Sequence, residues 1–228
     1  MAREKMIEKG VGSYISTLLR EYFGKGPSSV YVTVADPYIV IHLRGFLAPT
    51  EKILLKQNET RRILETRDIL MNDLRAEITL ELFKIGNFQV TEIYADWNLE
   101  EQTGLILGIF ERPSGIALKD CPKEIKNQKF LKAVEEVFEK VQKVPDSFEI
   151  YSLNDRTVLI ERSGIFIHIE IELIRAGFFE ELKLVKRPLE RKMLEQLELG
   201  QNIREVFLDW NFDEDKGVII LILQPEKS

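Results

Sequence analysis

The chain has 228 residues, of which 44% are hydrophobic and 31% charged, and its formal net charge is −6. This length allows one large domain or two ordinary ones, and the apolar content is sufficient for real cores. The acidic balance, without any basic stripe, argues against a nucleic-acid binder that works by neutralising phosphates. No apolar run approaches the roughly 18 residues that a membrane span needs, so we expect no direct membrane insertion.

Cysteine use and the N-terminus indicate the compartment. Cys121 is the single cysteine, which excludes an intramolecular disulfide and favours a reducing environment. The first residues lack the apolar core of a signal peptide. We therefore expect a cytoplasmic protein. The abundance of Lys, Arg and Glu is also typical of thermophilic proteins.

The chain begins with an amphipathic helix, because apolar residues recur at helical spacing between Ile7 and Tyr22. Gly24, Gly26 and Pro27 follow it. These glycines could form an anion-binding nest of backbone N–H groups, but a phosphate loop lies between a strand and the helix that follows it. We favour the interpretation that they cap and end the helix.

A hairpin, a short helix and a long helix are predicted next. Residues 30–34 and 38–43 have the composition of two strands joined by a turn. A short helix is expected over residues 48–55, and a long one from about residue 60 to 85, ended by Gly86 and Asn87. The apolar stripe of the long helix, which has Arg67 embedded in it, comprises Ile63, Leu70, Leu74, Ile78 and Leu82.

The tripeptide Asp-Trp-Asn occurs twice, as Asp96-Trp97-Asn98 and Asp209-Trp210-Asn211, and contains both tryptophans of the chain. A polar turn and a run of aliphatic residues follow each copy. Such a repeat indicates one module written twice. We predict modules at residues 1–112 and 127–228, joined by a Pro- and Gly-containing linker at residues 113–126. The predicted fold class is α+β: two tandem α-β-β-α-β-β modules with helices packed on antiparallel sheets, related by a pseudo-twofold axis.

The second copy is expected to differ from the first in its middle. Isoleucines alternate with other residues from Ile165 to Leu173, which predicts a strand where the first copy has its short helix. A helix should follow over residues 178–199, with Pro188 as a kink or a break.

The first copy resembles the MpsC-type domain, a family named after a sodium-translocating, membrane-potential-generating system. The resemblance covers about residues 5–110 and depends on residues 24–27, on the segment 43–52, and on Arg67 and Asp96. It implies an association with an ion- or bicarbonate-related membrane system and names no reaction. The chain departs from the family at Ala48, where Thr is usual.

The second copy preserves the family's motifs only in part. It keeps Pro145, Arg162 and Asp209, which the sequence comparison aligns with Pro27, Arg44 and Asp96. It has neither Gly-x-Gly-Pro nor Pro-x-Glu. The sequence therefore predicts that the motif between Arg44 and Glu51 is complete in the first copy alone.

Arg44 (followed by Gly45), Glu51 and Arg67 are the candidate binding residues. An Arg on a core-facing stripe needs a carboxylate or carbonyl partner, because an unpaired buried charge is too costly. A structural ion pair between Glu51 and an arginine is favoured. The alternative is a cleft in which a free guanidinium binds a small anion such as bicarbonate, a carboxylate or phosphate.

The repeated tripeptide itself does not predict a metal site. Its acidic spacing resembles a calcium loop, but Glu101 and Glu214 stand where the loop needs Gly, and Leu107 and Ile220 where it needs Glu. Trp97 and Trp210 are expected to be core or interface anchors, with Asp96 on the opposite face of its strand. The sequence suggests no catalytic residues, no metal and no cofactor.

Three hypotheses follow for the function. The first is a non-enzymatic accessory protein of the MpsC type with a protein partner at the membrane, existing as a monomer with an internal pseudo-dimer or as a homodimer. The second is a binder of a small anion near Arg44, Glu51 and Arg67. An enzyme is the third, because absent motifs do not exclude new chemistry.

Overall fold

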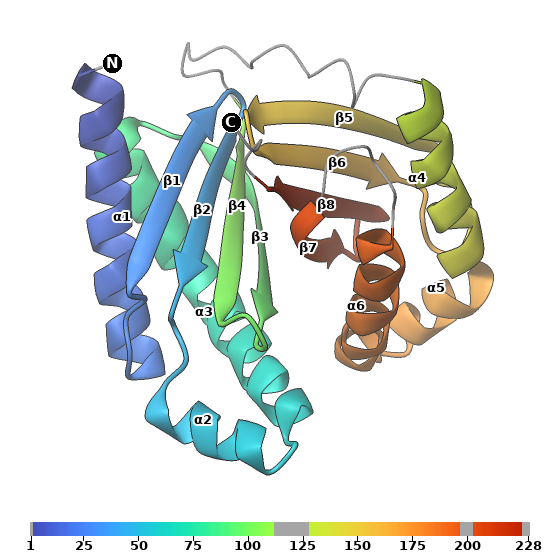
Figure 1. Cartoon of the computed structure of the whole chain (residues 1–228), viewed down its shortest axis with the longest axis horizontal. Coiled ribbons are helices and arrows are strands. Elements are labelled where there is room, and N and C mark those ends of the chain that lie inside the picture. Colours follow the sequence, from blue (N-terminus) through green and yellow to red (C-terminus); the bar gives the residue numbers. More distant parts are fainter. Residues whose placement is uncertain (1, 112–127, 197–202, 225–228) are drawn as a thin grey trace. The chain divides into compact units, whose positions relative to one another are not determined.

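The computed structural model describes residues 2–111, 128–196 and 203–224, and the chain divides into two units, Met1–Ala117 and Leu118–Ser228 (Figure 1). The predicted linker at residues 113–126, and Cys121 within it, lie outside the described residues. Each unit contains a four-stranded antiparallel sheet with helices, so the fold class is α+β, as predicted.

The first unit follows the predicted order of elements. Its sheet has the strand order β1-β2-β4-β3, and all neighbours are antiparallel. The elements are α1 (Ala2–Phe23), β1 (Ser29–Ala35), β2 (Tyr38–Arg44), α2 (Pro49–Lys56), α3 (Thr60–Gly86), β3 (Val90–Asn98) and β4 (Thr103–Phe110).

The core of the first unit lies between its sheet and the helices α1 and α3, which cover the same face of that sheet in Figure 1. Alternating residues of β2 and β3, such as Ile41, Leu43 and Trp97, point into this core. Along α3 the buried stripe contains Met71 where the sequence predicted Leu70, which is only partly buried. Arg67 lies in the middle of that stripe, as predicted.

Left-handed residues end both long helices of the first unit. Gly24 has φ of 73° directly after α1, and Asn87 has φ of 58° directly after α3. Gly26 is required for another reason: a Cβ there would lie 2.7 Å from the carbonyl oxygen of Ser16. Gly24, Gly26 and Pro27 thus occupy the loop between α1 and β1, where they turn the chain back onto the helix.

The second unit has the same topology. Its sheet has the strand order β5-β6-β8-β7, again with antiparallel neighbours. The elements are α4 (Gln128–Val141), β5 (Ser147–Asn154), β6 (Thr157–Ser163), α5 (His168–Arg175), α6 (Phe179–Glu195), β7 (Ile203–Asn211) and β8 (Lys216–Leu223).

The strand predicted from Ile165 to Leu173 is wrong, because most of this segment forms the helix α5. Ile167, Ile171 and Ile174 also fit a helical spacing, and the last two pack against the core. Glu170 begins the helix by accepting a hydrogen bond from the backbone N–H of Ile167 at 3.1 Å. Capping and packing therefore outweigh the β propensity of isoleucine.

Pro188 lies inside α6, which continues through it to Glu195. Of the predicted helix over residues 178–199, the last three residues lie outside the described part of the chain. None of the helices in the described ranges contains an apolar stretch that could cross a lipid bilayer.

The strand pairings correct the alignment of the two units. Leu43 lies opposite Gly104, and Arg162 lies opposite the equivalent Gly217, so Arg162 takes the place of Leu43 and not of Arg44. The register differs because β5 contains a bulge between Ser152 and Asn154, which adds a residue. Arg162 therefore points toward the helices, into what is an apolar core in the first unit.

Candidate functional site

Glu51 and Arg67 form a two-pronged ion pair in the first unit. Arg67 Nε donates to Glu51 Oε1 at 2.7 Å, and Arg67 Nη2 donates to Glu51 Oε2 at 2.8 Å. Glu51 Oε2 also accepts the backbone N–H of Ala48 at 2.8 Å, which caps α2. One carboxylate thus begins the short helix and holds it against α3.

Three aromatic rings surround the guanidinium of Arg67. Its Cζ lies 4.6 Å from the ring centroid of Phe23, 4.1 Å from that of Phe46 and 4.4 Å from that of Trp97. Arg67 is only 1% exposed. Burial lowers the pKa of Arg67, and the hydrogen bonds and charge of Glu51 oppose that shift. This geometry is that of a structural ion pair with cation–π contacts.

Arg44 does not join this pair. Leu43 points into the helix-covered core, so Arg44, the next residue of β2, points to the other face of the sheet. There its guanidinium carbon lies 5.3 Å from the ring centroid of Tyr31. Gly45 follows with φ of 63°, and its backbone N–H donates to the carbonyl of Gln102 at 2.8 Å. The three candidate residues therefore do not converge on one cleft.

The Asp-Trp-Asn tripeptides shape the ends of two hairpins. Asp96 Oδ1 accepts the backbone N–H of Trp97 at 2.8 Å, and Asn98 Oδ1 accepts that of Glu101 at 3.1 Å. The second unit repeats both bonds, at 2.9 and 3.2 Å, with Asp209, Trp210, Asn211 and Glu214. Both tryptophans belong to the cores of their units. Among the residues that the structure describes, no three His, Cys, Asp or Glu side chains could hold a metal ion together.

The second unit has a counterpart of the Glu51–Arg67 pair, although its sequence has no Pro-x-Glu at this place. Lys186 takes the place of Arg67, and its Nζ lies 2.8 Å from Glu170 Oε1. Glu170 caps α5 as Glu51 caps α2, although His168 replaces the proline of the motif. The helix position and the carboxylate are retained, while the Pro is dispensable.

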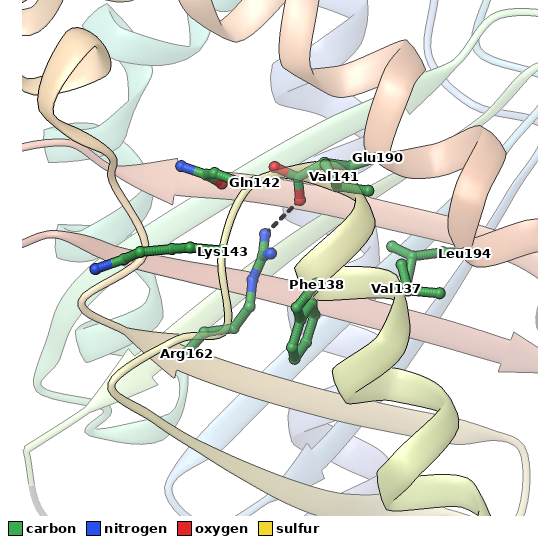
Figure 2. A pocket seen from close by; sticks show the side chains of 8 residues that line it. All are labelled: Val137, Phe138, Val141, Gln142, Lys143, Arg162, Glu190 and Leu194. Carbon is green, nitrogen blue, oxygen red and sulfur yellow. Dashed lines mark hydrogen bonds and ion pairs between the residues drawn. The ribbon is translucent and has the colours of Figure 1, made fainter.

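From Lys186 the buried charges continue to Arg162 on β6. Lys186 Nζ donates to Gln142 Oε1 at 2.7 Å and lies 3.2 Å from Glu190 Oε1. Glu190 Oε2 accepts a hydrogen bond from Arg162 Nη2 at 2.6 Å, drawn as the dashed line in Figure 2. Arg162 and Glu190 are 4% and 2% exposed. The sequence pattern did not predict this network, because Arg162 was aligned with Arg44, which lies on the other face of its sheet.

A small pocket of about 10 Å³ opens beside this network (Figure 2). It lies between α4, the end of β6 and α6, and combines an apolar wall with polar groups. Its lining residues are Val137, Phe138, Val141, Gln142, Lys143, Arg162, Glu190 and Leu194. Two buried polar atoms of this lining, Arg162 Nε and Glu190 Oε1, take part in no hydrogen bond. Glu190 Oε1 meets Lys186 as an ion pair, without hydrogen-bond geometry.

Glu190 should make the second unit sensitive to acid. Burial raises the pKa of its carboxyl, but the charges of Arg162 and Lys186, together with the hydrogen bond from Arg162, lower it more, so the pKa lies below its usual range. A depressed folded pKa stabilises the fold above the unfolded pKa of about 4.3, and this stabilisation is lost as the pH falls through the folded pKa.

We expect that Arg162→Leu/Glu190→Met, which removes both charges, unfolds at a lower pH than the parent. Acid titration of Trp210 fluorescence in a Trp97→Phe background would measure this. Equal acid midpoints for the parent and the double variant would contradict the role assigned to Glu190.

The fold and these sites describe an α+β protein of two similar halves, each with a lysine or arginine held by a helix-capping glutamate. The first unit belongs to the MpsC family, described as the Na⁺-translocating membrane potential-generating system, whose model matches residues 3–112. That match spans the first unit, including Glu51, Arg67 and the first Asp-Trp-Asn. No curated protein matched the chain. No solved structure matched it.

Proposed function

We propose that the chain is a non-enzymatic, cytoplasmic accessory protein that binds a protein component of an ion- or bicarbonate-related membrane system. Membership of the MpsC family supports the link to such a system. Because the chain has no described membrane-spanning helix, its link to the membrane would run through a partner.

An apolar stripe on α6 supports the partner-binding role. Phe178, Val185 and Leu189 are 51%, 66% and 49% exposed, and their spacing, with Leu182 between them, places them on one side of the helix. This stripe lies away from the buried face of α6, which carries Lys186 and Glu190. Exposed apolar side chains gathered on one helix are typical of protein interaction sites.

The first unit has polar residues at two of the three exposed positions of this stripe and Leu70 at the position of Leu189, which provides an internal comparison. Glu59 and Thr66 occupy the positions of Phe178 and Val185. The same fold is therefore stable with polar residues at these places, so the apolar ones are not needed for folding. A requirement for binding explains why the second unit exposes them.

The charges beside the stripe favour a protein partner over a lipid surface. Glu181 and Lys192, both exposed, lie along it and have opposite signs. A surface that binds anionic lipids would instead collect Lys and Arg. Mixed charges around an apolar centre are the usual rim of a protein interface.

Affinity capture from detergent-solubilised native membranes would test this proposal. We expect the tagged chain to retain one integral membrane protein, and we expect Val185→Glu/Leu189→Glu to reduce its recovery at least tenfold. Thr66→Glu, at the position of Val185 in the first unit, is the matched control and should change nothing. The affinity of the purified partner should likewise be similar for the parent and Thr66→Glu, and lower for Val185→Glu/Leu189→Glu. If the double variant and the control recover the same proteins as the parent, the stripe does not bind the partner; if no membrane protein is recovered by any of them, the proposed function is wrong.

A further inference from the structure

The strands at the margins of the two sheets differ in how their outer edges are protected. These margins are β1 and β3 in the first unit and β5 and β7 in the second (Figure 1). An outer edge presents N–H and C=O groups that can pair with another chain, so proteins usually block it with bulges, charged residues or covering side chains. A margin without such devices is therefore a candidate for pairing with another strand.

Three of the four described margins are blocked. Along β3, Arg75 Nη1 donates to the carbonyl oxygen of Ile93, and along β7, Arg191 Nε donates to the carbonyl oxygen of Val206 at 3.1 Å. Both strands also contain a bulge near their first residue. The margin β5 combines its own bulge with a charged residue, Glu149. Each of these features opposes the addition of a further strand.

The margin β1 differs from all three. All seven of its residues (Ser29–Ala35) are described, and their pairing with β2 runs without a bulge. The sequence Ser-Val-Tyr-Val-Thr-Val-Ala contains no charged residue and no proline. Tyr31 is 52% exposed, and Val30 and Val32 are half-buried. A regular, uncharged strand of β-branched and aromatic residues at a margin is suited to pairing with another strand.

The sequence of β1 fits a second copy of itself, because the five residues centred on Val32 read almost the same in both directions. In an antiparallel pair around a twofold axis at Val32, Val30 lies opposite Val34 of the second copy, and Tyr31 lies opposite Thr33. No like charges meet, and pairs of aromatic and β-branched side chains stabilise a sheet. The half-buried Val30 and Val32 pack against the core of the first unit, and a second strand beside them would extend that core.

The second unit shows that the fold does not require such an edge. Glu149 of β5 pairs with Glu161 where Tyr31 of β1 pairs with His42, so a glutamate occupies the position of Tyr31. The bulge of β5 then interrupts the regular pairing. The duplicated module therefore keeps the strand and blocks its margin, whereas the first module leaves the margin regular and uncharged.

We propose that β1 pairs with the β1 strand of a second copy of the chain, in an antiparallel twofold arrangement centred on Val32. The four-stranded sheets of the two first units then join into one continuous sheet. The contact is small, since each copy contributes mainly one strand, so we expect a dissociation constant in the micromolar range. This interface is separate from the α6 stripe and does not depend on the proposed function.

Two double variants test the register of this pair. Tyr31→Glu/Thr33→Glu places like charges directly opposite each other, while Tyr31→Glu/Thr33→Lys places opposite charges at the same positions. Sedimentation equilibrium of the full chain should show a reversible dimer. The like-charged variant should weaken the dimer about tenfold or more, and the oppositely charged variant should associate about as tightly as the parent.

Tyr151→Glu is the matched control. Tyr151 occupies the position of Thr33, so with Glu149 this variant places two glutamates in β5 where the like-charged variant has them in β1. It should leave the dimer unchanged, and so should Val185→Glu/Leu189→Glu on the α6 stripe. Loss of the dimer in the α6 variant would place the contact there and overturn the proposal.

Hydrogen exchange of the unmodified chain gives a readout that needs no variant to fold. Alternate amides of β1 face its outer edge, and their exchange should slow as the protein concentration rises. The amides of β5 should exchange at the same rate at every concentration. A chain that remains monomeric, a dimer that survives Tyr31→Glu/Thr33→Glu, or exchange in β1 that does not depend on concentration would each overturn the proposal.

Discussion

Replacing Glu51 by Ala should lower the free energy of unfolding of the first unit by about 3–5 kcal/mol, the cost of leaving a buried charge without its partner. Arg67 is 1% exposed, and its guanidinium donates two hydrogen bonds to this single carboxylate, which offset the loss of its hydration. The variant also removes the cap of α2, since Glu51 accepts the N–H of Ala48. Loss of a cap alone costs about 1 kcal/mol, so the ion pair provides most of the effect.

Urea denaturation followed by the fluorescence of Trp97, in a Trp210→Phe background, would measure this change for the first unit alone. Glu65→Ala is the matched control, because Glu65 forms an exposed ion pair with Arg61 on the same long helix. Exposed pairs contribute at most about 1 kcal/mol. Similar losses for Glu51→Ala and Glu65→Ala would contradict the buried, two-pronged geometry.

Arg162→Leu/Glu190→Met should raise the free energy of unfolding of the second unit by about 1–4 kcal/mol, because it replaces a buried ion pair with apolar side chains. Leucine and methionine are the residues of the first unit at these positions, Leu43 and Met71, where both are buried. The pocket of about 10 Å³ beside Arg162 would be filled or made apolar.

The single change Glu190→Met should have the opposite sign and lower stability by about 3–5 kcal/mol, since Arg162 would then be buried without a counter-charge. Denaturation followed by Trp210 in a Trp97→Phe background compares the two variants. The effects of the two substitutions on the free energy of unfolding are therefore expected to be strongly non-additive. A double variant that is as unstable as the single one would mean that the pocket region does not tolerate the apolar packing of the first unit.

Most of the fold could be predicted from the sequence because its elements are locally encoded. The ends of α1 and α3 are marked by Gly24 and Asn87, both left-handed. The repeated Asp-Trp-Asn gave the register of the last hairpins, since each Asp and Asn makes the same local hydrogen bonds. The one element of the wrong type, α5, is a segment whose isoleucines fit both a strand and a helix. Its capping partner Glu170 and its contacts with α6 decided between them.

The candidate site was less predictable, because its residues are far apart in the chain. The sequence indicated that Arg67 needs an anionic partner and that Glu51 begins a helix, and the structure brings these two together. It separates Arg44, because alternation along β2 sends Leu43 and Arg44 to opposite faces. Arg162 was aligned with Arg44 when its structural counterpart is Leu43, because the amino-acid sequence does not reveal the single-residue bulge in β5.

By itself the sequence determined what depends on neighbours along the chain: two modules of helices and hairpins, the ends of those helices, and the resemblance of the first module to the MpsC family. Only the tertiary structure decided which charged groups meet, that Lys186 and Glu170 reproduce the first unit's pair, and that Arg162 and Glu190 border a pocket. The reason is physical. Backbone conformation follows from local sterics and capping, whereas the partner of a buried charge depends on strand register and on which face of each helix is buried.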